Sequence, residues 1–275
     1  MPYPFSPGEA MPSSYVNSAL LKGGKNRIIN GAFLVNQRAY ASGTALASGS
    51  YGFDRWKSGY SNTTLTFTAG AQATTVTIST SGVLQQIIER ANVPAGTYVL
   101  SWSGTATGRV YNSGGTAPSY AASPVTVTLD GSANVVVEFT ASGSTKTLST
   151  VQLERGTVAS PFEYRLTAEE LELCRRYYRT IGNNGNVPIA CPAGFLINSV
   201  AGYVYVNFSP MRTTPTGTVT GTPAYSIGSG GFGTVSSAVF TGGGDSGGYI
   251  AIGGSGLPTG SAYNFFGQLN LSAEL

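Results

Sequence analysis

The stretch VTVTLDGSANVVVEFT, residues 125–140, sets the fold class of this chain. Its two outer runs, 125–129 and 135–140, are rich in Val and Thr, which favour pleated, half-buried strands. Asp130 and Gly131 stand between them, and glycine accepts the positive φ of a tight hairpin turn without a steric penalty. The stretch therefore predicts two antiparallel strands that are direct neighbours.

The same pattern extends outward from Arg27 to about Phe162. Short β-branched segments alternate there with Gly, Ser, Asn and Pro, as in TTVTIST (74–80) and TYVLSWS (97–103). Strands at this spacing are typical of a β-sandwich. Alternation along the second segment puts Tyr98, Leu100 and Trp102 on one face, which we expect to be the core face.

One connecting helix is expected over residues 166–182. Thr167 and Glu170 fit a capping box, with Thr167 as the N-cap, and Gly182 would end the helix. Leu171, Cys174 and Tyr178 then share a face that we expect to be packed.

The region from 183 to 275 is Gly-rich and contains only three charged residues, Arg212, Asp245 and Glu274. Strand patterns recur in it at 195–200, 203–208, 248–253 and 263–271, and they predict a second small domain resembling a β-sandwich. The motifs GSGGFG and TGGGDSGG lack the Lys-Ser/Thr pair of a phosphate-binding loop and are interpreted as surface turns. A surface so poor in charge favours association of identical copies, and we expect a homotrimer.

Composition excludes several classes of function. Charged residues make up 10% of the chain and the net charge is +3, which leaves no basic stripe for nucleic acid. Histidine is absent, which removes every triad built on imidazole, and neither a metal site nor a cofactor is expected. No apolar run is long enough for membrane insertion.

Two cysteines, Cys174 and Cys191, are too few for a disulfide framework, but a single bridge between them stays open. Cys174 as a nucleophile would need a base that the chain lacks, so a buried thiol is the expected state. Residues 1–26 hold four of the fourteen prolines without any period and are interpreted as an extended arm.

Four parts of the chain together resemble a family of bacteriophage tail-fibre and related virion proteins. They are RIINGAFLVNQR (27–38), YGFDRW (51–56), VQLERGTVASPFEYRLTAEELELCRRYY (151–178), and the pair VNFSPMRTTPTGTV (206–219) and SAEL (272–275). The resemblance implies a jelly-roll domain of the carbohydrate-binding-module type over 27–165, the connecting helix, and the C-terminal β domain over 183–275. It also implies a trimeric appendage located in the virion, attached to other virion proteins through residues 1–26.

Under that resemblance the chain would contribute to binding of host cell-surface glycan without being an enzyme. A purely structural appendage and a glycan-degrading tailspike remain as alternatives. Tyr60, Tyr111, Tyr120 and Trp56 are the candidate sugar contacts, since aromatic rings stack on pyranoses. Tyr111 and Tyr120 lie at the two ends of YNSGGTAPSY (111–120), which we expect to be an exposed loop. Structural roles are expected for Asp54 and Arg55, with a carboxylate holding Arg55 and Trp56 packed under it. They are also expected for Glu154 and Arg155 at the end of the sandwich, and for Thr167 and Glu170.

Overall fold

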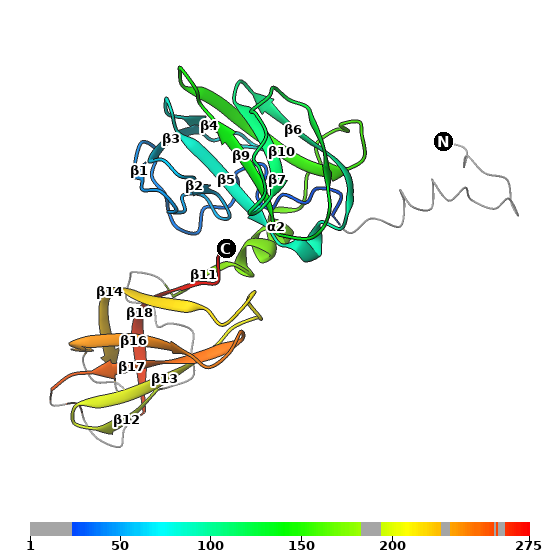
Figure 1. Cartoon of the computed structure of the whole chain (residues 1–275). Helices are drawn as coiled ribbons and strands as arrows, with labels where there is room; N and C mark the ends of the chain where they lie inside the picture. The colour runs from blue at the N-terminus through cyan, green and yellow to red at the C-terminus, as the bar shows by residue number, and fades with distance from the viewer. Residues whose placement is uncertain (1–23, 183–193, 227–231, 256, 258–261) are drawn as a thin grey trace, which may run out of the picture. The chain divides into compact units, whose positions relative to one another are not determined.

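The computed structural model describes residues 24–182, 194–226, 232–255, 257 and 262–275, and in this part of the chain the fold is all-β with one α-helix (Figure 1). The strands and helices of the first half are β1 (Ala45–Leu46), β2 (Lys57–Ser58), β3 (Thr63–Thr68), β4 (Thr75–Ile78), β5 (Val83–Ile88), the 3-10 turn η1 (Arg90–Asn92), β6 (Gly96–Gly104), β7 (Thr107–Asn112), β8 (Val125–Leu129), β9 (Val135–Thr140) and β10 (Lys146–Arg155). Those of the second half are α2 (Thr167–Arg175), β11 (Tyr178–Gly182), β12 (Gly194–Asn198), β13 (Ala201–Asn207), β14 (Thr216–Ser226), β15 (Phe232–Thr234), β16 (Ser237–Gly242), β17 (Gly247–Gly253) and β18 (Ala262–Ser272).

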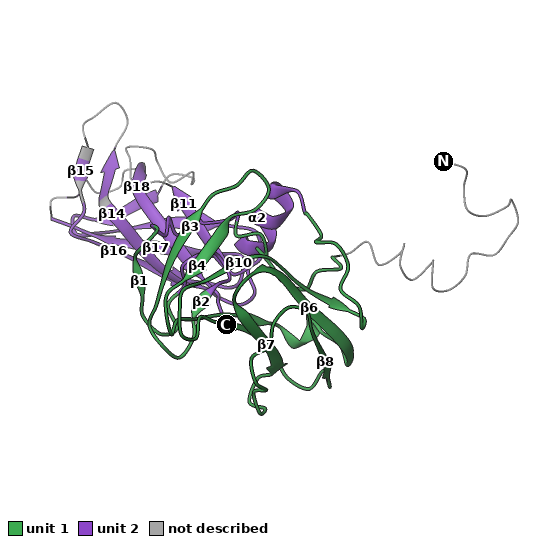
Figure 2. Ribbon diagram, turned by 90° about the horizontal axis from the view of Figure 1, so that it is seen from above, with its two compact units in different colours: residues 1–33, 42–50, 57–164 green, residues 34–41, 51–56, 165–275 purple. Residues whose placement is uncertain are grey.

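The chain forms two compact units, and Figure 2 colours each of them. The first takes in the described residues within 24–33, 42–50 and 57–164, and the second those within 34–41, 51–56 and 165–275. Segments 34–41 and 51–56 thus belong to the second unit, although the sequence placed them inside the jelly roll.

The first unit is a jelly-roll sandwich of two antiparallel sheets. Its six-stranded sheet has the order β1-β3-β4-β10-β6-β8, and its four-stranded sheet has the order β2-β5-β9-β7. Tyr98, Leu100 and Trp102 of β6 are buried as the alternation predicts. The Trp102 ring meets the edge of Phe139, from β9 of the other sheet, at 5.0 Å between centroids, so the core lies between the two sheets.

The hairpin predicted at Asp130-Gly131 is wrong in its pairing. Strand β8 pairs with β6, whereas β9 pairs with β5 and β7, so the turn carries the chain from one sheet to the other. Gly131 does adopt a φ of 70°, and Asp130 accepts a hydrogen bond from the Ser132 amide at 2.9 Å. The physical reason lies in burial, because all six residues of β9 are buried and need covered neighbours, whereas β8 is an edge strand.

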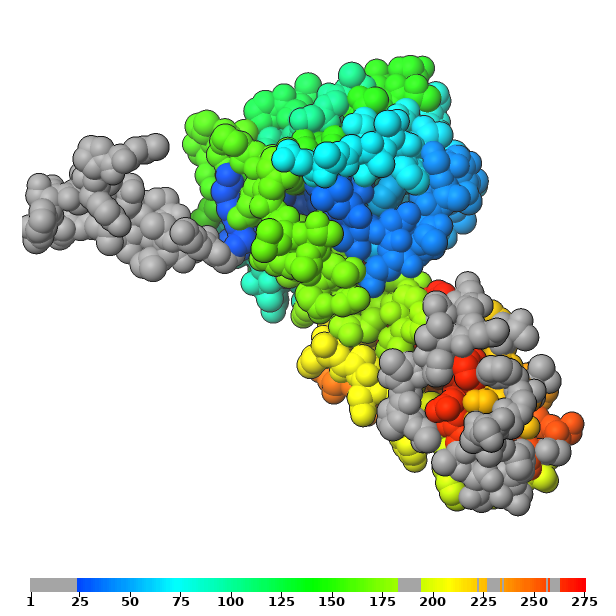
Figure 3. All heavy atoms as spheres, turned by 180° about the vertical axis from the view of Figure 1, so that it is seen from behind, coloured from blue at the N-terminus to red at the C-terminus, as the bar shows by residue number. Residues whose placement is uncertain are grey.

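The described chain begins inside the first unit. Asn26 is 4% exposed, donates to the Val151 carbonyl at 2.9 Å and accepts the Leu153 amide at 3.0 Å. The amides of Lys25 and Asn26 both donate to the Glu163 carboxylate, and in Figure 3 the blue start of the described chain lies against the yellow-green region around 160. Residues 24–26 therefore belong to the sandwich and not to the predicted arm. The rest of the predicted arm, residues 1–23, lies outside the described residues.

Helix α2 is shorter than the 166–182 predicted. It ends at Arg175, and residues 178–182 form β11 because they pair with β18 from Tyr178–Ser272 to Gly182–Gln268. Leu166 is the N-cap and no side chain caps the helix, so the predicted capping box is not formed and Thr167 is the first helical residue. Glu170 instead faces Arg165 at 3.3 Å.

The second unit is a β domain whose strands run in the order β15-β14-β18-β12-β13-β17-β16, with β11 also on β18. Alternation along β13 and β17 buries Val204, Val206, Ile250 and Ile252. These side chains pack in one core with Phe240 and the apolar residues of β18. The segment TGGGDSGG forms the turn between β16 and β17, as expected, whereas GSGGFG falls largely outside the described residues.

Candidate functional site

A polar row crosses the four-stranded sheet on the face opposite to the core. Lys57 of β2 lies opposite Gln85 of β5, Gln85 lies opposite Glu138 of β9, and Glu138 lies opposite Arg109 of β7. Residues directly opposite in antiparallel strands point to the same side. Their neighbours Val110, Val137 and Phe139 point the other way, into the core.

Glu138 is the centre of this row and is fully buried. Its Oε1 accepts hydrogen bonds from Arg109 Nε at 2.8 Å and from the Tyr120 hydroxyl, and its Oε2 accepts one from Gln85 Nε2 at 3.2 Å. Arg109 also donates to the Pro118 carbonyl at 3.2 Å. A buried carboxylate is stable only with such partners, so these hydrogen bonds hold the Glu138 side chain in one position.

Three tyrosines lie over the row. The hydroxyls of Tyr60 and Tyr120 are 3.1 Å apart, and the Arg109 guanidinium lies 4.1 Å from the Tyr120 ring centroid and 5.4 Å from that of Tyr111. Burial, reinforced by Glu138, raises the pKa of Tyr111 and Tyr120 above the ordinary phenol value, so both rings stay neutral donors. Tyr60 is 65% exposed and presents its ring to solvent.

The structure thus brings together three of the four predicted sugar contacts. Tyr111 is on β7 rather than in the loop assigned to it, and Tyr120 precedes Ala121, which bridges back to Gly108 of β7. Tyr111 and Tyr120 are half-buried, whereas the sequence predicted an exposed loop.

A groove of about 330 Å³ adjoins this tyrosine cluster. It opens between β7 and β8, the edge strands of the two sheets, and Tyr111, Asn112, Thr116 and Thr128 contribute its polar groups. Small concave sites lined by aromatic rings and a few hydroxyl or amide groups suit small polar ligands. The cluster and the groove form one surface suited to a sugar.

The contacts of Glu138 do not suit it to the acid–base role of a glycosidase carboxyl. A glycosidase needs one carboxyl that gives up a proton and a second one that acts as base or nucleophile. Both oxygens of Glu138 are already engaged by Arg109, Tyr120 and Gln85, so it is not placed to transfer a proton to a ligand.

The prediction that Trp56, the fourth candidate, contacts a sugar is wrong. Trp56 is 0% exposed and belongs to the second unit, so no face of its ring is open to a sugar. Asp54 and Arg55 have different partners in the structure. Asp54 accepts Arg38 Nη1 at 3.1 Å and the Gln37 amide at 2.6 Å. Burial raises the Asp54 pKa against these stabilising contacts.

Arg55 pairs with Glu274 instead, and its guanidinium lies 3.6 Å above the Tyr177 ring. Arg38 joins the same carboxylate at 3.0 Å and stacks on Tyr178 at 3.7 Å. Two arginines thus balance two carboxylates in a buried ion network made of Arg38, Asp54, Arg55 and Glu274. A neutral, stacked network of this kind is a structural centre of the second unit.

Three hydrogen bonds to main-chain carbonyls attach the remaining motif segments to this ion network. The Ala273 amide donates to the Tyr177 carbonyl at 2.7 Å, Arg212 Nε donates to the Ala273 carbonyl at 2.7 Å, and the Tyr51 hydroxyl donates to the Leu275 carbonyl at 2.8 Å. Parts of the segments 27–38, 51–56, 151–178, 206–219 and 272–275 therefore meet in one place. Their residues are explained by folding rather than by a ligand.

Glu154 and Arg155 also have structural contacts. Glu154 accepts the Ser160 amide at 2.8 Å, the Ser160 hydroxyl at 2.7 Å and Gln152 Nε2 at 2.8 Å. Arg155 donates to the Ala95 carbonyl at 3.4 Å. Burial opposes the charge of Glu154, but the Ser160 hydrogen bonds outweigh it and lower the pKa of the carboxyl.

Cys174 is a free, buried thiol. Burial, together with the carboxylates of Asp54 and Glu170, raises its pKa well above the ordinary value, which keeps the sulfur protonated and unreactive. Cys191 lies outside the described residues.

Sequence reasoning missed Arg109, Glu138 and Gln85, which organise the site. The available signal was Glu138 inside the apolar run VVVEFT, because a carboxylate in the middle of a buried strand requires a partner. Within the described ranges there is no group of three or more His, Cys, Asp or Glu placed to hold a metal, and no helix is long and apolar enough to cross a membrane.

No family model and no curated protein matches this sequence. Among solved structures, the chain is similar to a cycloisomaltooligosaccharide glucanotransferase from Paenibacillus sp., solved with cycloisomaltoheptaose, at 8% identity and a TM-score of 0.24. The similarity covers 86% of this chain and 46% of that protein, so this chain spans less than half its length. A TM-score this low carries no argument about function.

Proposed function

We propose that this chain is a bacteriophage fibre or spike protein that binds neutral glycan on the host cell surface through its jelly roll. The observation that carries the binding role is the cluster of Tyr60, Tyr111 and Tyr120 over the Arg109–Glu138 pair. A half-buried phenol offers a stacking face together with a fixed hydroxyl, which is what recognition of a pyranose requires.

Charge explains why the ligand is neutral. The Glu138 carboxylate and the Arg109 guanidinium neutralise each other and lie beneath the rings. A ligand therefore meets phenol, amide and hydroxyl groups. Such contacts are weak one by one, so binding to a cell would depend on several copies acting together.

The virion assignment is supported by the sequence resemblance and by the way its motif segments build the ion network of the second unit. The trimer is supported by exposed apolar residues of the second unit on and next to β12, which are Phe195, Ile197 and Val200. The second candidate function is a structural appendage without a ligand, because the ion network of the second unit is explained by folding alone.

The test is adsorption of the purified full-length protein to host cells, together with an array of neutral and acidic glycans. Tyr60→Ala and Tyr120→Phe should each weaken saturable binding about fivefold, the loss expected for one ring or hydroxyl contact. Tyr164→Ala is a matched control, because Tyr164 is an exposed tyrosine of the same unit outside the cluster. Absence of saturable binding by the wild type would leave the structural role standing.

Attachment to the virion is tested separately by deleting residues 1–22, which spares Lys25 and Asn26. The shortened protein should fold and be missing from purified particles. Normal incorporation would show that attachment uses another part of the chain.

A further inference from the structure

The second unit carries its own row of aromatic residues on the side of the sheet opposite to the core. Strands β13 and β17 are paired, with Tyr205 opposite Tyr249 and Asn207 opposite Gly247. Because Val204, Val206 and Ile250 point into the core, the side chains of Tyr203, Tyr205 and Asn207 point away from it.

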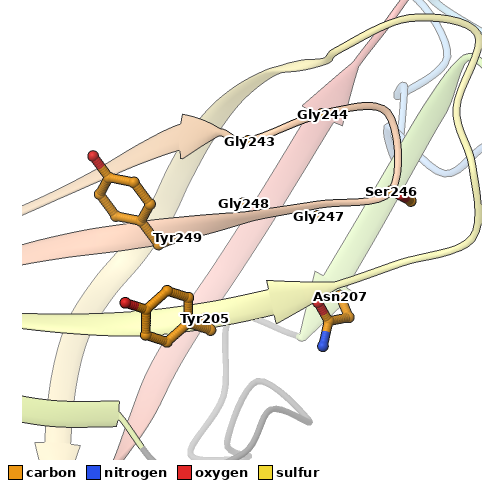
Figure 4. A pocket seen from close by; sticks show the side chains of 8 residues that line it. All are labelled: Tyr205, Asn207, Gly243, Gly244, Ser246, Gly247, Gly248 and Tyr249. Atoms are coloured by element: carbon orange, nitrogen blue, oxygen red, sulfur yellow. The ribbon is translucent and has the colours of Figure 1, made fainter.

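The Tyr249 ring contacts two other tyrosine rings, edge to face with Tyr203 and tilted with Tyr205. Ring centroids are 5.3 Å apart for Tyr203 and Tyr249 and 6.4 Å apart for Tyr205 and Tyr249. Tyr205 is 63% exposed. Figure 4 shows Tyr205 and Tyr249 side by side on adjacent strands, with Asn207 further along the strand of Tyr205. Tyr205 is thus open to solvent, and the half-buried Tyr249 holds it from the side.

A hollow of about 360 Å³ begins where these rings end. It is lined by Tyr205, Tyr249, Asn207, Ser246 and the glycines at 243, 244, 247 and 248 (Figure 4). Gly247 has no side chain to fill the place opposite Asn207, and the turn between β16 and β17 supplies backbone at the rim.

The glycine at 244 is not required by the fold of this chain. Its φ lies outside the left-handed region, and an added Cβ would meet nothing within 4 Å. Gly248 is different, because a Cβ there would lie 2.6 Å from the Phe240 ring of the core. Glycine at 244 leaves the hollow open and lets a ligand approach the backbone.

The groups around the hollow are polar and uncharged. Among the described residues, neither the Asn207 amide nor the hydroxyls of Tyr205 and Tyr249 have a hydrogen-bond partner in the protein. Asp245, in the same turn, is the nearest charge along the sequence, and the region from 183 onward has only two others. Stacking rings beside unoccupied neutral donors and acceptors match a polyhydroxyl ligand.

We infer that this hollow is a second saccharide-binding site, specific for neutral oligosaccharides and separate from the tyrosine cluster of the jelly roll. It does not rest on the function proposed for the first unit, since all its residues belong to the second. A second copy of the chain is the competing occupant. Self-association would bury the Asn207 amide and the tyrosine hydroxyls, which costs free energy unless each finds a partner.

The test uses the full-length protein and a panel of neutral gluco-, manno- and galacto-oligosaccharides, with binding measured by saturation-transfer NMR and calorimetry. Gly244→Leu fills the hollow and Tyr249→Ala removes a ring. Each should weaken binding of the responding sugar about tenfold while the unfolding temperature and the oligomer mass stay unchanged. Val239→Ala is the matched control, because Val239 is 61% exposed on a neighbouring strand and does not line the hollow.

The double variant Tyr60→Ala/Tyr120→Phe separates the two sites. It should retain binding at the hollow, and Gly244→Leu should retain the glycan binding of the first unit. Unchanged sugar binding in both Gly244→Leu and Tyr249→Ala would overturn the inference. A change in oligomer mass in Gly244→Leu would overturn it as well, by showing that the hollow receives another copy.

Discussion

Arg109 is the residue on which the buried Glu138 carboxylate most depends. Replacing Arg109 with Met keeps most of the aliphatic bulk but removes the cation. We expect a loss of about 3–5 kcal/mol in the free energy of unfolding, because breaking a buried pair leaves an uncompensated charge. Urea unfolding measures it, and the double variant Arg109→Met/Glu138→Gln should recover much of the loss. A single-variant loss below about 1 kcal/mol would show that water reaches the carboxylate.

Glu154 gives the first unit an acid-sensitive contact. Its folded-state pKa is lowered, so its stabilising contribution is present above the unfolded pKa and is lost as pH falls through the folded value. Ser160→Ala removes one donor and should lower stability near neutral pH by about 1 kcal/mol. It should also flatten the dependence of stability on pH between about 5 and 3. Thr157→Ala, at an exposed site in the same loop, is the control, and parallel pH profiles for the two variants would refute the assignment.

At the scale of single elements, helix α2 lacks the N-terminal cap that the sequence predicts. The N-cap position is Leu166, which is 78% exposed and has extended backbone angles, with φ of −60° and ψ of 139°. Leu166→Asp should raise stability by about 1 kcal/mol, since its carboxylate can accept an amide of the first turn and also meets the positive end of the helix dipole. Thr167→Ala should change little. Thermal unfolding of both variants tests this assignment. A loss of stability of about 1 kcal/mol or more in Thr167→Ala would show that Thr167 caps the helix after all.

Strand identity was readable from the sequence, but strand partners were not. Tyr98, Leu100 and Trp102 face the core because alternation depends only on the local backbone. The pairing of β8 and β9 failed because a turn of the same residues can close a hairpin or cross to another sheet, and distant strands decide which. The same distinction holds for the site. The tyrosines could be chosen from the sequence because of their residue type, whereas the Arg109–Glu138 pair depends on the alignment of β7 with β9.

At the scale of the whole molecule, we expect a trimer with three times the 28.3 kDa of one chain in light scattering at micromolar concentration. Phe195→Glu puts a charge on an apolar residue that is 55% exposed in the second unit, and it should shift the mass toward that of one chain. Val158→Glu, at a residue 79% exposed in the first unit, should leave the mass unchanged. A stable monomer of the wild type would contradict the trimer.

The interleaving of the two units has a consequence for synthesis and for inheritance. Arg38 and Arg55 leave the ribosome early, yet their carboxylate partner Glu274 follows 236 and 219 residues later. Until Glu274 is made, the second unit cannot complete its ion network, whereas all the strands of the jelly roll, which end at Arg155, have already left the ribosome. A genetic exchange at any one point between them would separate those arginines from Glu274. Hybrid genes that keep the second unit folded must therefore carry residues 34–41 and 51–56 together with 165–275.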